Sequence, residues 1–173
     1  MNMSDLLIAT GSWSKNIFWE LYKTSTLPPA ELCTAVMCVA VAGDRIVLAR
    51  SGRGWGMLGG HIENGETLDD ALFREAREEG GFSISDYEPF AVRKITVRTP
   101  EPNRTGASYP FPTSYIVYYW ATTDQPIDDP TGEEIIESGS FASSDVGVLN
   151  TPDQPIIEAG WKEYAKHVGL LPK

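Results

Sequence analysis

The chain is predicted to fold as an α/β (α+β) domain in which helices cover a mixed β-sheet. Segments rich in β-forming residues alternate with segments of helical periodicity, in the order strands, helix, strands, helix. A length of 173 residues suits one domain with a real core, and a composition of 42% hydrophobic and 22% charged residues is that of a globular protein. Helices packed on a sheet are the architecture that this order of elements favours.

The first 30 residues are expected to form an arm packed on a domain that spans residues 31–173. They mix Ser, Trp, Phe and Tyr and end on Pro28-Pro29. For residues 15–22 we expect either a short helix or an extended segment. No second domain boundary is visible further along the chain.

Residues 34–50 are predicted to form a β-hairpin. Apolar β-formers at 34–42 and 45–50 flank the turn dipeptide Gly43-Asp44. The glycine-rich stretch 51–65 follows, and we expect an ordered loop there because apolar residues, among them Trp55 and Leu58, interrupt the glycines. Residues 67–79 are the clearest helix, since Thr67 and Asp70 resemble a capping box and Gly80-Gly81 supplies the stop.

The second half of the chain is expected to contribute three strands and a helix. Residues 90–98 and 113–122 are predicted strands, and residues 135–141 are a third, interrupted at Ser138-Gly139. Between the first two lies a loop over 99–112 that contains four prolines. Residues 153–168 have the apolar spacing of a C-terminal helix.

The helix at 67–80 places carboxylates where apolar residues are expected. Its core-facing stripe consists of Leu68, Ala71, Leu72 and Ala76. Glu75 and Glu79 continue that stripe, and Glu78 borders it. A solvated acidic face is the usual explanation of a Glu-rich helix, but buried carboxylates are costly unless they are paired or bind a metal.

These glutamates are therefore predicted to bind a metal ion. Residues three and four apart are neighbours on a helix, so Glu75, Glu78 and Glu79 can converge on one point. Oxygen-only ligands suit Mg²⁺, with Mn²⁺ as the alternative, rather than zinc. The pair Gly59-Gly60 just before the helix lets backbone approach a ligand closely.

From Gly60 onward the segment GHIENGETLDDALFREAREEGGF resembles the signature of the Nudix hydrolase family. The matching positions are Gly60, Glu66, Arg74, Glu75, Glu78, Glu79, Gly81 and Phe82. Ala76 departs from the bulkier aliphatic residue that is usual in the family, but it still suits a core-facing position. The resemblance implies a Nudix-type α/β/α sandwich with a mixed β-sheet between helices.

It also implies a hydrolase of nucleoside diphosphates linked to another moiety, such as a nucleotide sugar, ADP-ribose, a nucleoside triphosphate or a dinucleoside polyphosphate. By analogy Glu78 and Glu79 are metal ligands, Glu75 is a further ligand or the base, and the carbonyl of Gly60 completes the shell. Arg74 would orient the glutamates, and Glu66 and Gly59 have supporting roles.

The resemblance also implies a second carboxylate downstream. Glu133, Glu134 and Glu137 are the candidates. Glu137 is preferred and Glu134 comes next, although a solvated acidic turn explains any one of them equally well.

Substrate recognition is assigned to the loop at 99–112 and to residues near the glycine stretch. Tyr109 or Phe111 would stack on a base, while Arg53, Arg98 or Arg104 would meet phosphate. Trp55 is either a binding platform or a core residue. The family's markers for ADP-ribose, dinucleoside polyphosphate and coenzyme A substrates are absent, so the substrate stays open.

The composition and net charge limit the classes of molecule with which the chain is expected to interact. A formal charge of −10 and the lack of a Lys/Arg cluster argue against an RNA 5′-end pyrophosphohydrolase, which is one alternative function. A nucleotide-sensing binding module is the other, and it would be expected to lose the helix glutamates. Without a signal peptide or a long apolar run we expect a cytoplasmic protein with no membrane partner and with two buried thiols, Cys33 and Cys38. Dimers are frequent in the resembling family, so a homodimer is an open alternative to a monomer.

Overall fold

One mixed β-sheet forms the centre of the molecule. The computed structural model describes residues 6–100, 109–123, 129–149 and 151–172. Within them the strands follow the order β1-β2-β7-β8-β3-β4-β5, with β6 paired to β3 and β9 paired to β4. The strands are β1 Leu6–Ser12, β2 Ile17–Lys23, β3 Cys33–Ala42, β4 Arg45–Ser51, β5 Gly54–Gly56, β6 Leu58–His61, β7 Asp86–Val97, β8 Thr113–Thr122 and β9 Ile135–Ala142. Strands β3 and β8 run parallel, whereas the other pairs are antiparallel.

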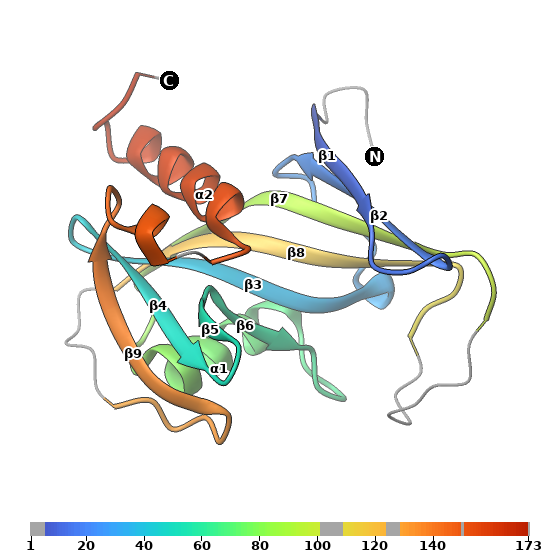
Figure 1. Ribbon diagram of the computed structural model, residues 1–173, viewed down its shortest axis with the longest axis horizontal. Helices are drawn as coiled ribbons and strands as arrows, with labels where there is room; N and C mark the ends of the chain where they lie inside the picture. The colour runs from blue at the N-terminus through green and yellow to red at the C-terminus, as the bar shows by residue number, and fades with distance from the viewer. Residues whose placement is uncertain (1–5, 101–108, 124–128, 150, 173) are drawn as a thin grey trace.

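Two α-helices cover opposite faces of the sheet (Figure 1). Helix α1 (Leu68–Gly80) packs Leu72 and Ala76 against one face, and α2 (Gln154–His167) packs Ile157 against the other. Two short 3₁₀ turns, η1 (Ala30–Leu32) and η2 (Val146–Leu149), complete the described elements. The predicted fold, a mixed sheet between helices, is confirmed.

Strand β3 contributes side chains to the two hydrophobic cores, one between the sheet and α1 and the other between the sheet and α2. Its side chains alternate, as they must in a strand, so Val36 and Cys38 join the α1 core while Val39 and Val41 join the α2 core. The strand is therefore apolar on both faces, which is typical of a central strand. Both cysteines are buried free thiols, as expected.

The predicted hairpin and the predicted helix are also confirmed. Strands β3 and β4 pair across a turn in which Gly43 has a φ of 64°. At the start of α1 the Thr67 and Asp70 side chains form a reciprocal capping box, and Gly81 ends the helix in the left-handed conformation. These local signals determine where α1 begins and ends.

The N-terminal arm is extended and not α-helical within the described residues. Residues 6–23 form the hairpin β1–β2, and β2 pairs along its whole length with β7, so a short helix at residues 15–22 is wrong. In β2 Trp19 and Leu21 alternate with Glu20 and Tyr22, but Phe18 beside Ile17 obscures the period of a strand. The hairpin extends the sheet at the edge formed by β7 (Figure 1).

Three further strand regions differ in part from the prediction. The glycine-rich stretch is ordered but contains the short strands β5 and β6 rather than only loop. Strand β7 begins at Asp86, because its pairing with β8 continues past a register shift at Pro89. Strand β9 runs through Ser138-Gly139 without interruption, since β4 pairs with it there. In the described part of the chain, neither α-helix is long and apolar enough to span a bilayer.

Candidate active site

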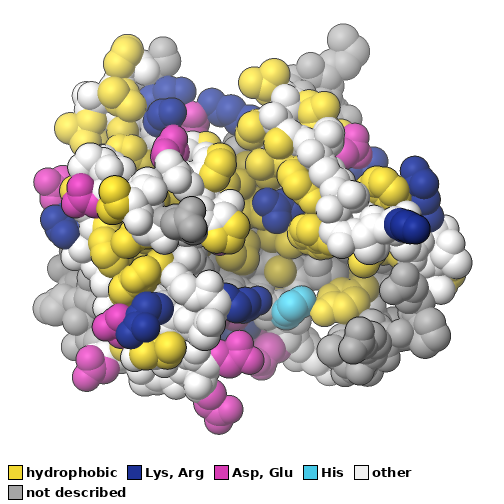
Figure 2. Space-filling model, in the orientation of Figure 1, with side chains coloured by type: hydrophobic (Ala, Val, Ile, Leu, Met, Phe, Trp, Pro, Cys, Tyr) yellow, Lys and Arg dark blue, Asp and Glu magenta, His cyan; other side chains and the backbone are white. Residues whose placement is uncertain are grey.

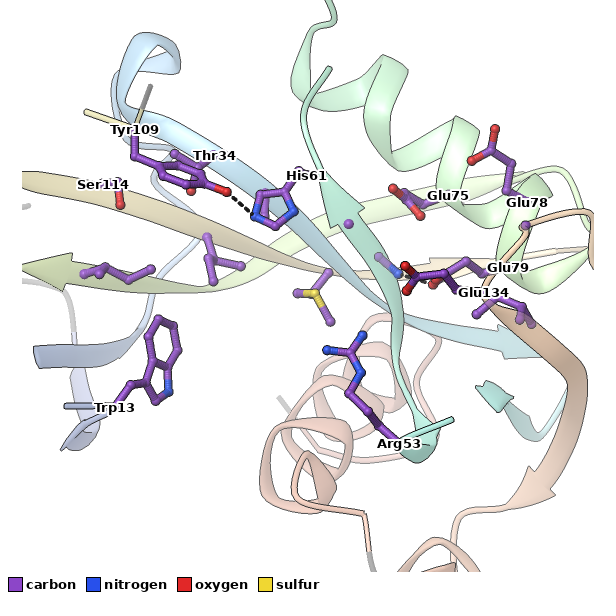
Figure 3. A pocket seen from close by; sticks show the side chains of 18 of the residues that line it. Trp13, Thr34, Arg53, His61, Glu75, Glu78, Glu79, Tyr109, Ser114 and Glu134 are labelled. Carbon is purple, nitrogen blue, oxygen red and sulfur yellow. Dashed lines mark hydrogen bonds between the residues drawn. The ribbon is translucent and has the colours of Figure 1, made fainter. Parts of the chain in front are cut away.

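A cavity of about 730 Å³ lies between α1, β6, the 132–135 segment and the strands β3, β7 and β8 of the sheet. Figure 2 shows the hollow, with hydrophobic side chains around it and acidic side chains gathered below it. Its wall is acidic at one end and apolar at the other. The acidic end includes Glu75, Glu78, Glu79 and Glu134, and the apolar end includes Trp13 and Tyr109 (Figure 3). Strand pairing brings Ile17 beside Val97 and Ile95 beside Ser114 in the wall of the same cavity, which also includes Ile116.

The acidic end is built by the last turns of α1. Glu75 is buried, with 7% of its surface exposed, while the Glu78 side chain is 44% exposed. Glu79 is partly buried beside the glycine pair. The helical spacing thus brings the three predicted metal ligands to the same cavity, as expected from their positions on one face.

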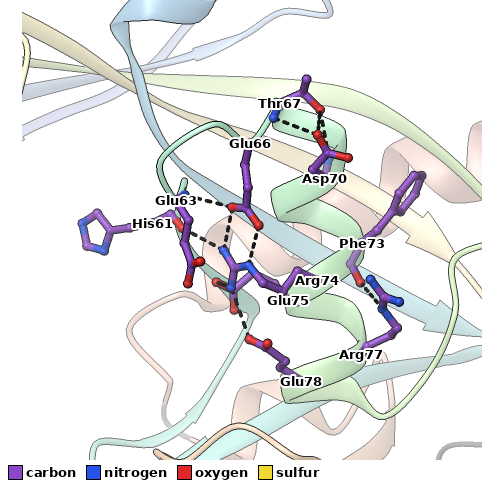
Figure 4. A network of polar contacts seen from close by, with 10 residues as sticks. All are labelled: His61, Glu63, Glu66, Thr67, Asp70, Phe73, Arg74, Glu75, Arg77 and Glu78. Carbon is purple, nitrogen blue, oxygen red and sulfur yellow. Dashed lines mark hydrogen bonds and ion pairs between the residues drawn. The ribbon is translucent and has the colours of Figure 1, made fainter.

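Arg74 holds two of these glutamates in place (Figure 4). Its guanidinium donates to Glu75 Oε1 at 2.8 Å and to Glu78 Oε2 at 3.2 Å. It also donates to Glu66 Oε1 at 2.7 Å and to the carbonyl oxygen of His61 at 3.0 Å. Hydrogen bonds from Arg74 hold the pKa of Glu66 below its usual range. Arg74 therefore ties α1 to the loop that precedes it.

The glycine pair fits closely against two of the carboxylates. The Gly59 amide donates to Glu79 Oε2 at 2.7 Å, and Gly59 has a φ of 141°, where a side chain would be strained. A Cβ at Gly60 would lie 2.2 Å from Glu75 Oε1. Gly59 therefore requires glycine, and a side chain at Gly60 would displace the buried Glu75 carboxylate.

Burial makes these carboxylates receptive to a cation. Desolvation raises the pKa of Glu79 to about 7, although the Gly59 amide opposes the shift. Burial likewise raises the pKa of Glu75, against the opposing hydrogen bond from Arg74. Removing carboxylates from water favours the neutral acid unless a positive charge arrives to compensate.

The residues at this end fit a hard divalent cation by their donor chemistry. They offer carboxylate oxygens and backbone carbonyls, which are the ligands that such a cation prefers. One carboxylate oxygen of each glutamate already accepts a hydrogen bond, from Arg74 in Glu75 and Glu78 and from the Gly59 amide in Glu79. As the side chains stand, no three His, Cys, Asp or Glu residues among the described residues are grouped so that they could hold a metal ion.

Two of the predicted substrate contacts reach the cavity. Arg53 lines it beside Glu79, and Tyr109 lines its far end, where the Tyr109 hydroxyl lies 3.0 Å from Nε2 of His61. Trp55 lies instead in a smaller neighbouring cavity of about 310 Å³ and packs edge-on against Phe141 at 4.8 Å.

The other predicted contacts are not brought to the cavity. Arg98 stacks its guanidinium on the Phe18 ring at 4.0 Å, so it holds β2 against the end of β7. Phe111 is 53% exposed and does not line the cavity. Arg104 lies outside the described residues.

Of the downstream candidates, Glu134 lines the cavity and the preferred Glu137 does not. Glu137 forms an ion pair with Arg50 on the β4–β9 surface, whereas Glu134 lines the cavity close to Glu79 (Figure 3). The difference arises because the amides of Thr131 and Gly132 donate to the carbonyl of Glu78 at 2.9 and 2.8 Å. This contact places the chain just before β9 against α1, and no local sequence signal reveals it.

Sequence reasoning missed Trp13 and His61. His61 follows the glycine pair directly, so its proximity to the site could have been found from the same spacing that identified Gly60. Trp13 has no such signal, since it reaches the cavity only because the hairpin β1–β2 joins the sheet beside β7.

Residues 31–159 match the model of the NUDIX domain, which covers well over half of the chain. The chain belongs to the NUDIX domain family. The match contains α1, the glycine pair and Glu134, while the hairpin β1–β2 precedes it.

Curated relatives of this NUDIX chain include two proteins named NAD-capped RNA hydrolase NudC. The Citrobacter koseri protein is 31% identical over 124 residues, which are 66% of this chain and 42% of that protein. The Mycobacterium tuberculosis (strain ATCC 25177 / H37Ra) protein is 27% identical over 143 residues, 80% of this chain and 40% of that protein. The chain thus spans less than half the length of the curated relatives it matches.

Solved structures share the NUDIX fold with this chain. The Bacillus subtilis pyrophosphohydrolase BsRppH has a TM-score of 0.65 at 17% identity and covers 91% of this chain and 98% of its own. The NUDIX domain of Shewanella oneidensis NrtR, solved with ADP ribose, has a TM-score of 0.58 at 15% identity over 76% of this chain and 87% of its own. At such identities the likeness concerns the fold alone.

Proposed function

We propose that this NUDIX chain is a Mg²⁺-dependent hydrolase that cuts a phosphoanhydride bond in a nucleoside diphosphate linked to another moiety. One observation carries the proposal: the cavity joins a cluster of carboxylates at one end to an apolar, aromatic surface at the other. The first end suits cations that bind a diphosphate, and the second suits a nucleobase.

Glu75, Glu78, Glu79 and the carbonyl of Gly60 are the groups that would hold Mg²⁺, or Mn²⁺ in its place, with Glu134 facing them from the opposite wall. A bound divalent cation supplies charge neutralisation for the diphosphate and lowers the pKa of a bound water. Arg74 keeps Glu75 and Glu78 oriented through its hydrogen bonds. We assign Glu134, which lines the same cavity close to Glu79, as the group that accepts the proton of the attacking water.

The remaining cavity residues bind and position the substrate. Arg53 lies beside Glu79 and is placed to meet a phosphate oxygen. Tyr109 presents an aromatic ring, 41% exposed, at the apolar end. A nucleotide would therefore lie along the cavity with its diphosphate near α1.

A second candidate is a pyrophosphohydrolase that acts on the 5′ end of RNA. The names of the curated relatives favour it, because both describe a hydrolase of NAD-capped RNA. The net charge of −10 disfavours it, since a polyanionic chain would be repelled. A nucleotide-sensing module is less favoured than either, because all the helix glutamates are kept and face one cavity.

The proposal is tested by assaying phosphate or nucleotide release from a substrate panel with Mg²⁺ and then with EDTA. The panel comprises nucleoside triphosphates, nucleotide sugars, ADP-ribose, NAD, dinucleoside polyphosphates and a NAD-capped oligoribonucleotide. We expect Mg²⁺-dependent turnover of at least one small diphosphate. Turnover of the capped RNA alone would select the second candidate, and binding without turnover would select the sensing module.

A further inference from the structure

The N-terminal hairpin contributes a wall of the cavity that lies outside the NUDIX match. Trp13, in the turn between β1 and β2, lines the apolar end of the cavity although 54% of its surface is exposed. An indole left half-exposed at a cavity wall differs from one buried in a core. It presents a flat apolar face that a ligand ring can cover.

Trp13 and Tyr109 approach the apolar end from different sides. Figure 3 shows Tyr109 on one wall and Trp13 across the cavity from it, both far from the glutamates of α1. Aliphatic side chains, including Ile95 and Val97 of β7, lie in the wall of the same cavity. The two exposed rings thus bracket an apolar space, which is the shape that a planar heterocycle fills.

The turn that carries Trp13 is fixed before any ligand arrives. The Trp13 amide donates to the carbonyl of Ile17 at 3.0 Å and closes the turn. The Asn16 side chain donates to the carbonyl of Thr99 and accepts from the Thr99 amide, both at 2.8 Å. The Asn16 carbonyl accepts from the Arg98 amide at 3.0 Å. These contacts hold the turn to the end of β7, so little ordering is needed on binding.

Arg93 of β7 contacts the aromatic rings of the hairpin β1–β2. Its guanidinium lies 5.8 Å from the Trp13 ring, 5.0 Å from the Trp19 ring and 5.3 Å from the Tyr118 ring. Its Nε is buried and has no hydrogen-bond partner within the described residues, and its positive charge acts on the Asp153 carboxyl as well as on the aromatic faces. This cation–π stack positions Trp13 relative to the core ring of Tyr118.

We infer that Trp13 is a specificity residue that stacks on a planar heterocycle of the substrate, opposite Tyr109, with Arg93 as its positioning residue. The inference rests on the proposed function for the location of the diphosphate, and it names the moiety at the other end. The hairpin β1–β2 is then part of the binding site. It follows that the chain prefers diphosphates that carry a base or another flat ring over those that carry only sugar.

The experiment compares binding of AMP and of ribose 5-phosphate in Mg²⁺ by calorimetry, in the wild type, Trp13→Ala, Trp13→Phe and Leu7→Ala. Leu7 is the matched control, because it is an exposed apolar residue of the same hairpin and lies outside the cavity. We expect the wild type to bind AMP at least about tenfold more tightly than ribose 5-phosphate. Trp13→Ala should lose most of that preference, whereas Trp13→Phe and Leu7→Ala should keep it.

Equal affinity of the wild type for both ligands, or an unchanged preference in Trp13→Ala, would overturn the inference. Neither ligand is a diphosphate, so the result does not depend on turnover. A preference that depends on Trp13 in a protein without hydrolase activity would leave the inference standing and refute the proposed function. For Arg93→Met we expect a raised KM with kcat kept, and Arg93→Lys should restore part of the KM because it restores the cation.

Discussion

At the scale of single residues, the direction in which a carboxylate points decides its role. Glu134 and Glu137 are three positions apart in the sequence, yet one lines the cavity and the other pairs with Arg50. Their proximity in sequence made them equivalent candidates. The structure separates them because the amides before Glu134 bind the end of α1.

Replacing Glu134 and Glu137 by glutamine, one at a time, tests whether only Glu134 contributes to turnover. Glu134→Gln removes a carboxylate that faces Glu79, so we expect kcat to fall by at least about tenfold. Glu137→Gln breaks only an exposed ion pair, which contributes little to stability, and kcat should not change. Steady-state kinetics of the two variants measure the contrast, and a larger loss in Glu137→Gln would reverse our assignment.

Glu79 should make the stability of the metal-free protein depend on pH. Burial raises its pKa from 4.5 to about 7, so the folded state holds a proton that the unfolded state has lost. This contribution to stability is complete below about pH 4.5 and is lost as the pH rises through about 7. We therefore expect the Tm in EDTA to fall between about pH 5 and about pH 7.5.

Glu79→Gln is the control for that pH dependence. It has no proton to lose, so its Tm should fall less over the same interval. Mg²⁺ favours the ionised carboxylates and should stabilise the wild type more at the upper end of the interval than at the lower end. A wild-type Tm that falls no more than that of Glu79→Gln over this interval in EDTA would contradict the raised pKa of Glu79.

At the scale of elements, α1 serves both the core and the site, and the two roles separate along its length. The capping box of Thr67 and Asp70 begins the helix outside the cavity lining, whereas the last turns carry the glutamates. Gly60 of β6 lies against Glu75. Substitutions at the two places should therefore have different consequences.

Thr67→Ala and Gly60→Ala make this comparison. Loss of the cap should lower the free energy of unfolding by about 1 kcal/mol, or the Tm by about 3 °C, without changing kcat or KM. Gly60→Ala would place a Cβ 2.2 Å from Glu75 Oε1, so we expect a large loss of kcat because the carboxylate must move. Thermal unfolding and steady-state kinetics of both variants provide the test, and unchanged turnover in Gly60→Ala would contradict the close fit.

Elements with strong local signals were predicted from the sequence. The capped helix α1, the hairpin β3–β4 and the strand β8 each carry their own periodicity or turn residues. The strands β5, β6 and β2 do not, because glycines or scattered aromatics obscure the period and pairing with a neighbour decides the conformation. The same reason explains why the sequence predicted Glu75, Glu78 and Glu79 as candidates, which do line the cavity, while Trp13 was missed.

At the scale of the whole molecule, the net charge of −10 opposes polyanionic substrates, and only the local site favours a phosphate. If the chain acts on small diphosphates, kcat/KM should be lower for a NAD-capped oligoribonucleotide than for NAD. The difference should shrink as the salt concentration rises from about 50 to about 300 mM, because salt screens the repulsion. A preference for the capped RNA that weakens with salt would instead show attraction and support the RNA function.

The central claim is that the last turns of α1 form a metal-dependent hydrolytic centre, since they bring Glu75, Glu78 and Glu79 to one cavity. The most direct test is the turnover of the best panel substrate by the wild type and by Glu78→Gln, with Mg²⁺ present. Glu78 is half-exposed, so the variant should fold normally, with an unchanged circular dichroism spectrum. We expect its kcat to fall by at least about a hundredfold, and EDTA should abolish turnover by the wild type. Near-normal turnover by Glu78→Gln, or wild-type turnover that persists in EDTA, would contradict the claim.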